Sequence, residues 1–187
     1  MQMNGSLGWA WFLNLGIPLA LLGFAYGCGG VASINGEPLR PASTALEGRK
    51  HAEGLASRWD GTAKLVGVAG WRVRRDGRLA VTSDSLWVYT FRRPGDGVYF
   101  EVRRDGRGAV DSGSIATLQM QELWEEPIAG WRVDSPAVAE HVNRAQLPVG
   151  EELEMQLTQD GVWRVNVEDG QFLGEIWIDA RSGKRLL

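Results

Sequence analysis

Asp-Gly pairs divide much of this chain into short segments, and they constrain its fold more than any other feature. The pairs occur at residues 60–61, 76–77, 96–97, 105–106, 160–161 and 169–170. They favour hairpin turns because glycine adopts the positive φ angles that such turns need. Several of the runs between turns alternate apolar and polar residues, as strands with one buried face do. The sequence therefore predicts antiparallel β-hairpins.

The runs between these turns have the length and composition of strands. The predicted strands are Leu65–Arg75, Leu86–Arg93, Val98–Arg104, Glu151–Gln159, Val162–Glu168 and Phe172–Asp179. One more strand is predicted around Ile115–Glu122, followed by a loop through Pro127 and Gly130.

Two helices are predicted, one before each group of strands. In the first, Ser43 or Thr44 can cap the start, and Glu47 completes a capping-box pattern with Thr44. In the second, Asp134 or Ser135 can cap the start, and a proline in the first turn is compatible with helix. The apolar residues of the first helix recur at helical spacing, so one face is expected to be buried.

The order helix, strand, strand, strand therefore occurs twice. Trp87 and Trp163 occupy the same place in the two copies, at the start of the middle strand. This pattern predicts an α+β fold of two tandem α-β-β-β units, residues 44–120 and 121–187, each a helix packed on an antiparallel sheet. An apolar N-terminal helix is expected to precede them.

The N-terminal region differs from the rest of the chain because residues 1–36 contain no Asp, Glu, Lys or Arg. Residues 7–27 are apolar apart from Asn14, a length between a signal-peptide core and a bilayer-spanning helix. Residues 1–27 are thus predicted to be a signal peptide or a transmembrane anchor, with the membrane contacted through residues 7–28. Residues 28–43 are rich in glycine and proline, which predicts a flexible linker.

The only cysteine, Cys28, directly follows the apolar segment after Gly27. The motif resembles the lipobox of bacterial lipoproteins, in which a small residue precedes a lipidated cysteine. That resemblance implies lipidation at Cys28 and a location in the cell envelope. The alternative is a single transmembrane anchor beside an unmodified cysteine. With one cysteine, no disulfide can form within the chain.

The duplicated units resemble PepSY and PepSY-like domains of bacterial exported proteins. The resemblance rests on Asp134-Ser135 at a helix start, on the strand that begins at Trp163, and on the ending Asp179-Ala180-Arg-Ser-Gly183. The first copy matches more loosely, through residues 52–59 and 87–91. The family implies a helix packed on an antiparallel sheet and a regulatory or inhibitory binding role, often towards peptidases. It brings no catalytic residues.

Strand alternation predicts which side chains face the helices. The expected inward residues are Trp71, Val73, Trp87, Tyr89, Phe91, Val98, Phe100 and Val102 in the first copy, and Leu153, Met155, Leu157, Trp163, Val165, Val167, Ile176 and Ile178 in the second. The opposite face is expected to be free, basic in the first copy and acidic in the second. If the two sheets join edge to edge, this face becomes one charge-divided surface for a protein partner. The residues predicted to bind that partner are Arg72, Arg74, Arg92, Tyr99, Arg103 and Trp177.

The sequence offers no recognisable catalytic centre. The two histidines, His51 and His141, lie on predicted helices, and no set of cysteine and histidine residues suits a zinc site. A formal net charge of −3 disfavours nucleic-acid binding. We therefore expect a non-enzymatic binding or regulatory module without cofactor or metal. The alternative is a structural or assembly factor of the cell envelope.

Overall fold

The computed structural model describes residues 44–115, 125–145, 152–168 and 172–186, all within the compact unit Ser33–Leu187. The predicted anchor, the predicted linker and Cys28 lie outside the described residues. Within the described part, neither helix is both long and apolar enough to cross a bilayer.

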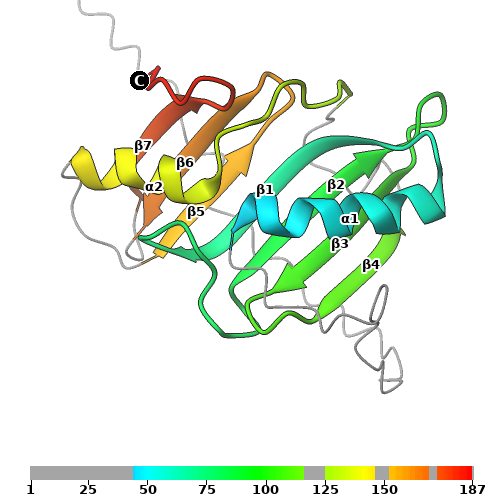
Figure 1. The fold of residues 1–187 in the computed structure, drawn as a ribbon, viewed down its shortest axis with the longest axis horizontal. Helices are drawn as coiled ribbons and strands as arrows, with labels where there is room; N and C mark the ends of the chain where they lie inside the picture. The colour runs from blue at the N-terminus through cyan, green and yellow to red at the C-terminus, as the bar shows by residue number, and fades with distance from the viewer. Residues whose placement is uncertain (1–43, 116–124, 146–151, 169–171, 187) are drawn as a thin grey trace, which may run out of the picture. The chain divides into compact units, whose positions relative to one another are not determined.

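The described chain forms two helices and one antiparallel sheet of seven strands (Figure 1). The elements are α1 (Ala45–Trp59), β1 (Lys64–Arg74), β2 (Leu86–Arg92), β3 (Tyr99–Asp105), β4 (Val110–Ile115), α2 (Ser135–Arg144), β5 (Glu152–Leu157), β6 (Val162–Glu168) and β7 (Phe172–Asp179). The strand order is β4-β3-β2-β1-β5-β6-β7. Both helices lie on one side of the sheet, which we call the helix face; the other side is called the far face.

The α+β class is confirmed, but the description as two tandem units is wrong. The edge strands of the two predicted sheets, β1 and β5, pair with each other, for example at Val68 and Leu157. One core cluster contains buried residues from both helices and from strands of both halves. The repeated order of elements is therefore built into a single sheet, because pairing at this seam satisfies two edges that would otherwise stay open.

The starts of the two helices meet and share one carboxylate. Thr44 caps α1 with Glu47 in the expected capping box, and Asp134 caps α2. The Asp134 carboxylate accepts hydrogen bonds from the backbone N–H of Ser135 at 2.7 Å and of Leu46 at 2.9 Å. The Ser135 hydroxyl accepts from Ala45 N–H at 3.1 Å. Side chains at the start of α2 thus accept hydrogen bonds from N–H groups at the start of α1, 88 to 90 positions earlier in the chain. The free N–H groups of both helix ends are satisfied at one place.

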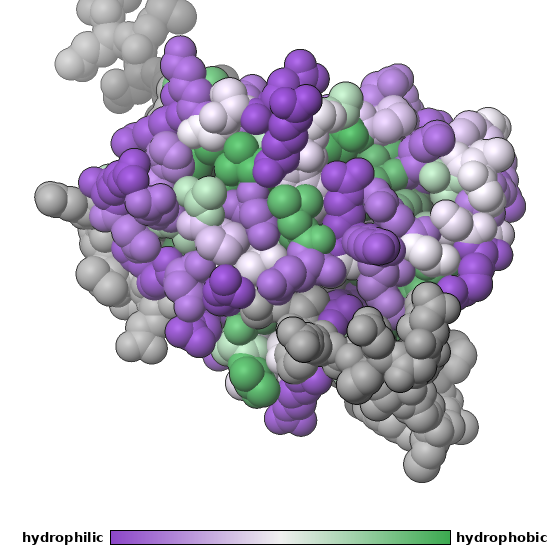
Figure 2. All heavy atoms as spheres, viewed as in Figure 1, coloured by the Kyte–Doolittle hydropathy of each residue, from purple (hydrophilic) through white to green (hydrophobic). Residues whose placement is uncertain are grey.

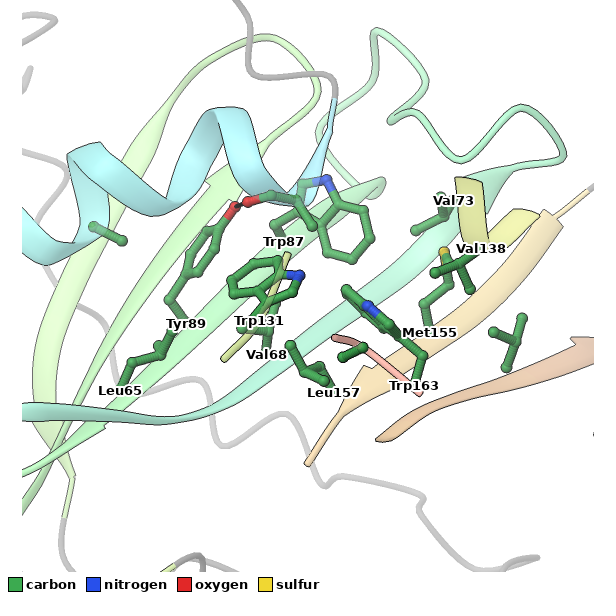
Figure 3. Packing of buried hydrophobic residues seen from close by; sticks show 14 of the residues in the cluster. Leu65, Val68, Val73, Trp87, Tyr89, Trp131, Val138, Met155, Leu157 and Trp163 are labelled. Carbon is green, nitrogen blue, oxygen red and sulfur yellow. Dashed lines mark hydrogen bonds between the residues drawn. The ribbon is translucent and has the colours of Figure 1, made fainter. Parts of the chain in front are cut away.

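Three tryptophans fill the centre of the core between helices and sheet (Figure 3). The rings of Trp87 and Trp163, the matched residues of the two copies, lie edge to face with centroids 6.3 Å apart. Trp131 packs on Trp163 at 5.8 Å. Gly70 makes room for this cluster, since a Cβ there would lie 2.2 Å from the Trp87 ring. The two matched tryptophans therefore connect the two halves of the chain within one core.

The helix α1 packs closely on the strands beneath it. Its buried face consists of small residues, Ala45, Gly48, Ala52 and Ala56. The Tyr89 hydroxyl donates to the Ala45 carbonyl at 2.7 Å, and a Cβ on Gly48 would lie 2.1 Å from that hydroxyl. At the end of the helix, Trp59 stacks on Phe100 with ring centroids 5.1 Å apart.

Alternation predicts the helix face correctly in the second half. Every expected inward residue there whose side chain is described is buried in the core; Val167 lies outside the described side chains. In the first half a bulge between Gly70 and Val73 breaks the alternation. Trp71 is consequently on the far face, 40% exposed, and its predicted inward position is wrong. Val98 precedes β3 instead of belonging to it.

The strand predicted around Ile115–Glu122 overlaps the described chain only at Ile115. The structure places β4 at Val110–Ile115, directly after the turn that follows β3. The remainder of the predicted strand, like the predicted boundary at residue 120, falls among residues outside the described ranges.

Candidate interaction site

Part of the far face is buried in the first half of the chain. Four of its side chains are buried: Val66, Val88, Thr90 and Tyr99. Tyr99 is only 1% exposed, so the expectation that it stands free as a partner-binding anchor is wrong. Alternation assigns a residue to a face, but it cannot say whether that face is covered, and this explains the error.

The far face is open where β1 bulges. Arg72 has a φ of 51°, a left-handed conformation that is unfavourable for a residue with a Cβ. It is the only residue other than glycine with positive φ in the described chain. Trp71 pairs with Leu86 of β2, which precedes the inward-facing Trp87, so both lie on the far face. The bulge therefore presents an indole ring to solvent in the middle strand of the sheet.

Ion pairs hold the strained residue in place. The Arg72 guanidinium donates to Glu152 of β5 at 2.8 Å and also pairs with Asp84 on the loop before β2. The hydrogen bond with Glu152 is the main cause of a raised pKa at Arg72. The contact with Glu152 crosses the seam between the basic and the acidic halves, so part of the charge division is neutralised within the chain.

A hollow of about 260 Å³ lies beside Leu86. Its lining comes from the loop before β2 and the start of β2, from β3, and from the following turn and the start of β4: Ser83, Leu86, Arg103, Asp105, Ala109, Val110 and Asp111. Arg103 is held by Glu101, with its Nη2 atom 2.8 Å from the carboxylate. Asp105 accepts hydrogen bonds from the backbone of Arg107 and Ala109 at 3.0 and 2.8 Å. The lining thus combines apolar side chains with one guanidinium and two carboxylates.

The predicted partner-binding residues do not form one cluster. Arg72 lies at the bulge, Arg103 lines the hollow, and Arg74 pairs with Asp76 at the end of β1. At the opposite end of the sheet Arg92 pairs in register with Tyr99 and donates to the Glu125 carbonyl at 3.0 Å.

Trp177 is on the far face of β7, where the Arg164 guanidinium lies 5.0 Å from its ring centroid. The strand register places Arg103 and Trp177 on one row across the sheet. Five strand spacings separate them, about 24 Å. Trp177 therefore cannot share a small site with Arg103.

Trp71 and Leu86 are the site residues that sequence reasoning missed. Trp71 faces away from the helices because of the bulge in β1, and the periodicity of the sequence does not reveal a bulge. Trp71 and Val81, at 40% and 74% exposure, are two of the three large exposed apolar residues in the described chain. Val81 belongs to the same loop as Ser83 of the hollow.

Figure 2 shows that the helix face is mostly hydrophilic, with apolar residues only in small separate groups.

The helix face holds a buried cation that alternation could have indicated. Arg104 follows Val102 by two residues, shares its face, and is 4% exposed. Burial lowers the pKa of Arg104, while Tyr89 and Glu47 act in the opposite direction. Burial, and then the charges of Arg104 and Arg58, lower the pKa of His51. The charges of Arg104, Tyr89 and Glu47 therefore influence one another where α1 packs on the sheet.

The described residues contain no group of three His, Cys, Asp or Glu side chains placed to hold a metal ion. No family model, no curated protein and no solved structure matches this chain. The resemblance to PepSY domains therefore stays a prediction that rests on the motifs given above.

Proposed function

We propose that this chain is a non-enzymatic, membrane-tethered module that binds a protein partner through the far face around Trp71. The observation that carries the proposal is an exposed tryptophan on a strained bulge, paired with Leu86 beside a hollow. Tryptophan and arginine contribute more to interface energies than most other residues. Strained backbone and bulges also concentrate at functional positions.

The chemistry around Trp71 suits a protein surface better than a reaction. Trp71 supplies an apolar anchor, and the hollow next to it is lined by both apolar and charged side chains. Arg72, the residue after Trp71, forms an ion pair with Glu152, so charged groups lie near the apolar anchor, a mixture that is common at interfaces. The regulatory role implied by the PepSY-like motifs agrees with such a site.

Site-specific photocrosslinking tests the binding proposal. A photoreactive phenylalanine analogue replaces Trp71 in the full chain, which is then irradiated in its native membranes. We expect a discrete adduct with one protein from position 71 and none from Leu186, which has a similar exposure of 47% and serves as the control. Equal labelling from both positions, or no adduct at position 71, contradicts the proposal.

The membrane tether is a separate part of the proposal. We propose that Cys28 is lipidated and that the described domain lies in the cell envelope. The intact mass of protein extracted from membranes tests this, since a chain that begins at an acylated Cys28 differs from a full-length chain by the whole segment 1–27. A full-length mass would instead indicate that the segment is kept as a transmembrane anchor.

A further inference from the structure

The outer edge of β4 carries backbone groups that point away from the sheet. In the turn before it, Asp105 N–H donates to the Ala109 carbonyl at 3.0 Å, so these two residues form a hydrogen-bonded pair. Such pairs alternate along antiparallel strands. Asp111 and Gly113 therefore bond to β3, while the N–H and C=O groups of Val110, Ser112 and Ser114 point outward.

This edge has few of the features that protect sheet edges, and Asp111 is its one charged residue. Residues 111–114 are all exposed, and β4 contains no proline and no lysine. No described residue pairs with its outer side. The other edge strand, β7, is partly covered, since Leu186 N–H donates to the Trp177 carbonyl and Asp179 N–H donates to the Lys184 carbonyl. An open edge without such protection is a template for strand addition.

The hollow described above begins at this same edge. Val110 and Asp111 of β4 line it together with Leu86 and Asp105. Asp111 pairs in register with Arg103, so its carboxylate is on the far face, next to the position that an added strand would occupy. Arg103 itself is held by Glu101, and the two aspartates are the anionic side chains among the lining residues.

We propose that an extended segment of a partner protein adds to the β4 edge as an eighth strand and places a lysine or arginine side chain in the hollow. Main-chain hydrogen bonds to Val110, Ser112 and Ser114 supply affinity. The basic side chain extends across β4 on the far face, and its charge lies between Asp105 and Asp111. This inference rests on the proposed protein-binding function and names the chemistry of the partner.

A second copy of this chain fits the edge less well. A two-fold axis through the sheet pairs residues that share a face, so Asp111 can meet Ala109, Gly113, Ile115 or a second Asp111. None of these registers brings a basic side chain to Asp111. Charge complementarity therefore favours a different, basic segment.

Two matched peptides test the proposal on the full chain in detergent micelles. They are the acetylated peptide Thr-Val-Thr-Lys-Thr-Val-Thr and the same peptide with glutamate in place of lysine. We expect the lysine peptide to bind about fivefold more tightly at low salt, the upper range for an exposed ion pair. The difference should shrink at high salt. Fluorescence anisotropy of labelled peptides measures both affinities, and hydrogen exchange should show protection at Ser112 and Ser114.

Two variants separate the edge from the hollow. Ser112→Pro removes an outward N–H without affecting the bonds to β3, so it should abolish binding of both peptides. Asp111→Asn should reduce the difference between the peptides, whereas Glu175→Gln, an exposed acid on β7, should leave it unchanged.

Equal affinity of the two peptides for the unmodified chain, or binding that survives Ser112→Pro, overturns the proposal. Absence of binding also overturns it. A dimer in sedimentation that Ser112→Pro dissolves would assign the edge to a second copy instead. In each case a persistent adduct from position 71 would show that the broader binding function still holds.

Discussion

The two halves of the sheet have the same order of elements but differ in what they leave accessible. In the first half, β1 to β4, the far face buries Val66, Thr90 and Tyr99 but is open near the bulge and the hollow. In the second half, β5 to β7, the described far-face side chains are half-buried or exposed, as alternation predicts. The helix faces are alike, since both are buried under a helix. Accessible surface, and not secondary structure, therefore distinguishes the two halves.

The largest expected effect tests whether the halves unfold together. Trp87→Ala and Trp163→Ala each remove a fully buried indole ring from the shared cluster, at a cost of about 4 kcal/mol. Because both rings belong to one core, each variant should shift a single unfolding transition of the domain. Urea unfolding followed by circular dichroism measures this.

The control for this comparison is Trp177→Ala, which lies outside the core and should cost less than about 1 kcal/mol. Two separate transitions, with each core variant affecting only one, would restore the description as independent units.

The next effect concerns the shared carboxylate at the helix starts. Asp134→Ala removes an acceptor used by both α1 and α2, and we expect a loss of about 3 kcal/mol. Thr44→Ala affects only α1 and should cost about 1 kcal/mol. Thermal unfolding of both variants gives the comparison. Equal losses would mean that the bond from Leu46 to Asp134 contributes little, and that the halves depend on each other less than the geometry indicates.

Much of the fold follows from local sequence signals. The Asp-Gly turns, the capping box at Thr44 and Glu47, and the cap at Asp134 each depend on neighbouring residues, so the sequence contains them directly. The pairing of β1 with β5 depends on which distant edges meet. We expected it only as one possible way of joining two sheets, since no periodicity encodes it.

The candidate site was less predictable than the fold. Arg72 and Arg103 were expected on the far face, and both lie there near the bulge and the hollow. Trp71 was assigned to the wrong face because one bulge reverses all positions before it relative to those after it. The burial of Tyr99 could not be foreseen, because cover on a sheet face comes from distant parts of a chain.

The smallest expected effect isolates the strain at the seam between the halves. Arg72→Gly and Arg72→Ala both remove the ion pairs to Glu152 and Asp84, so these losses cancel when the two variants are compared. Only glycine accepts a φ of 51° without strain, and we expect the glycine variant to be more stable by about 1 kcal/mol. Chemical unfolding of the two variants measures the difference. Equal stability of the alanine variant would mean that the bulge relaxes when Arg72 is replaced. The exposure of Trp71 would then depend on the ion pairs of Arg72 and not on the backbone conformation. Crosslinking from position 71 in the glycine variant distinguishes these cases, since a backbone-determined bulge keeps the indole position in place when the arginine is gone.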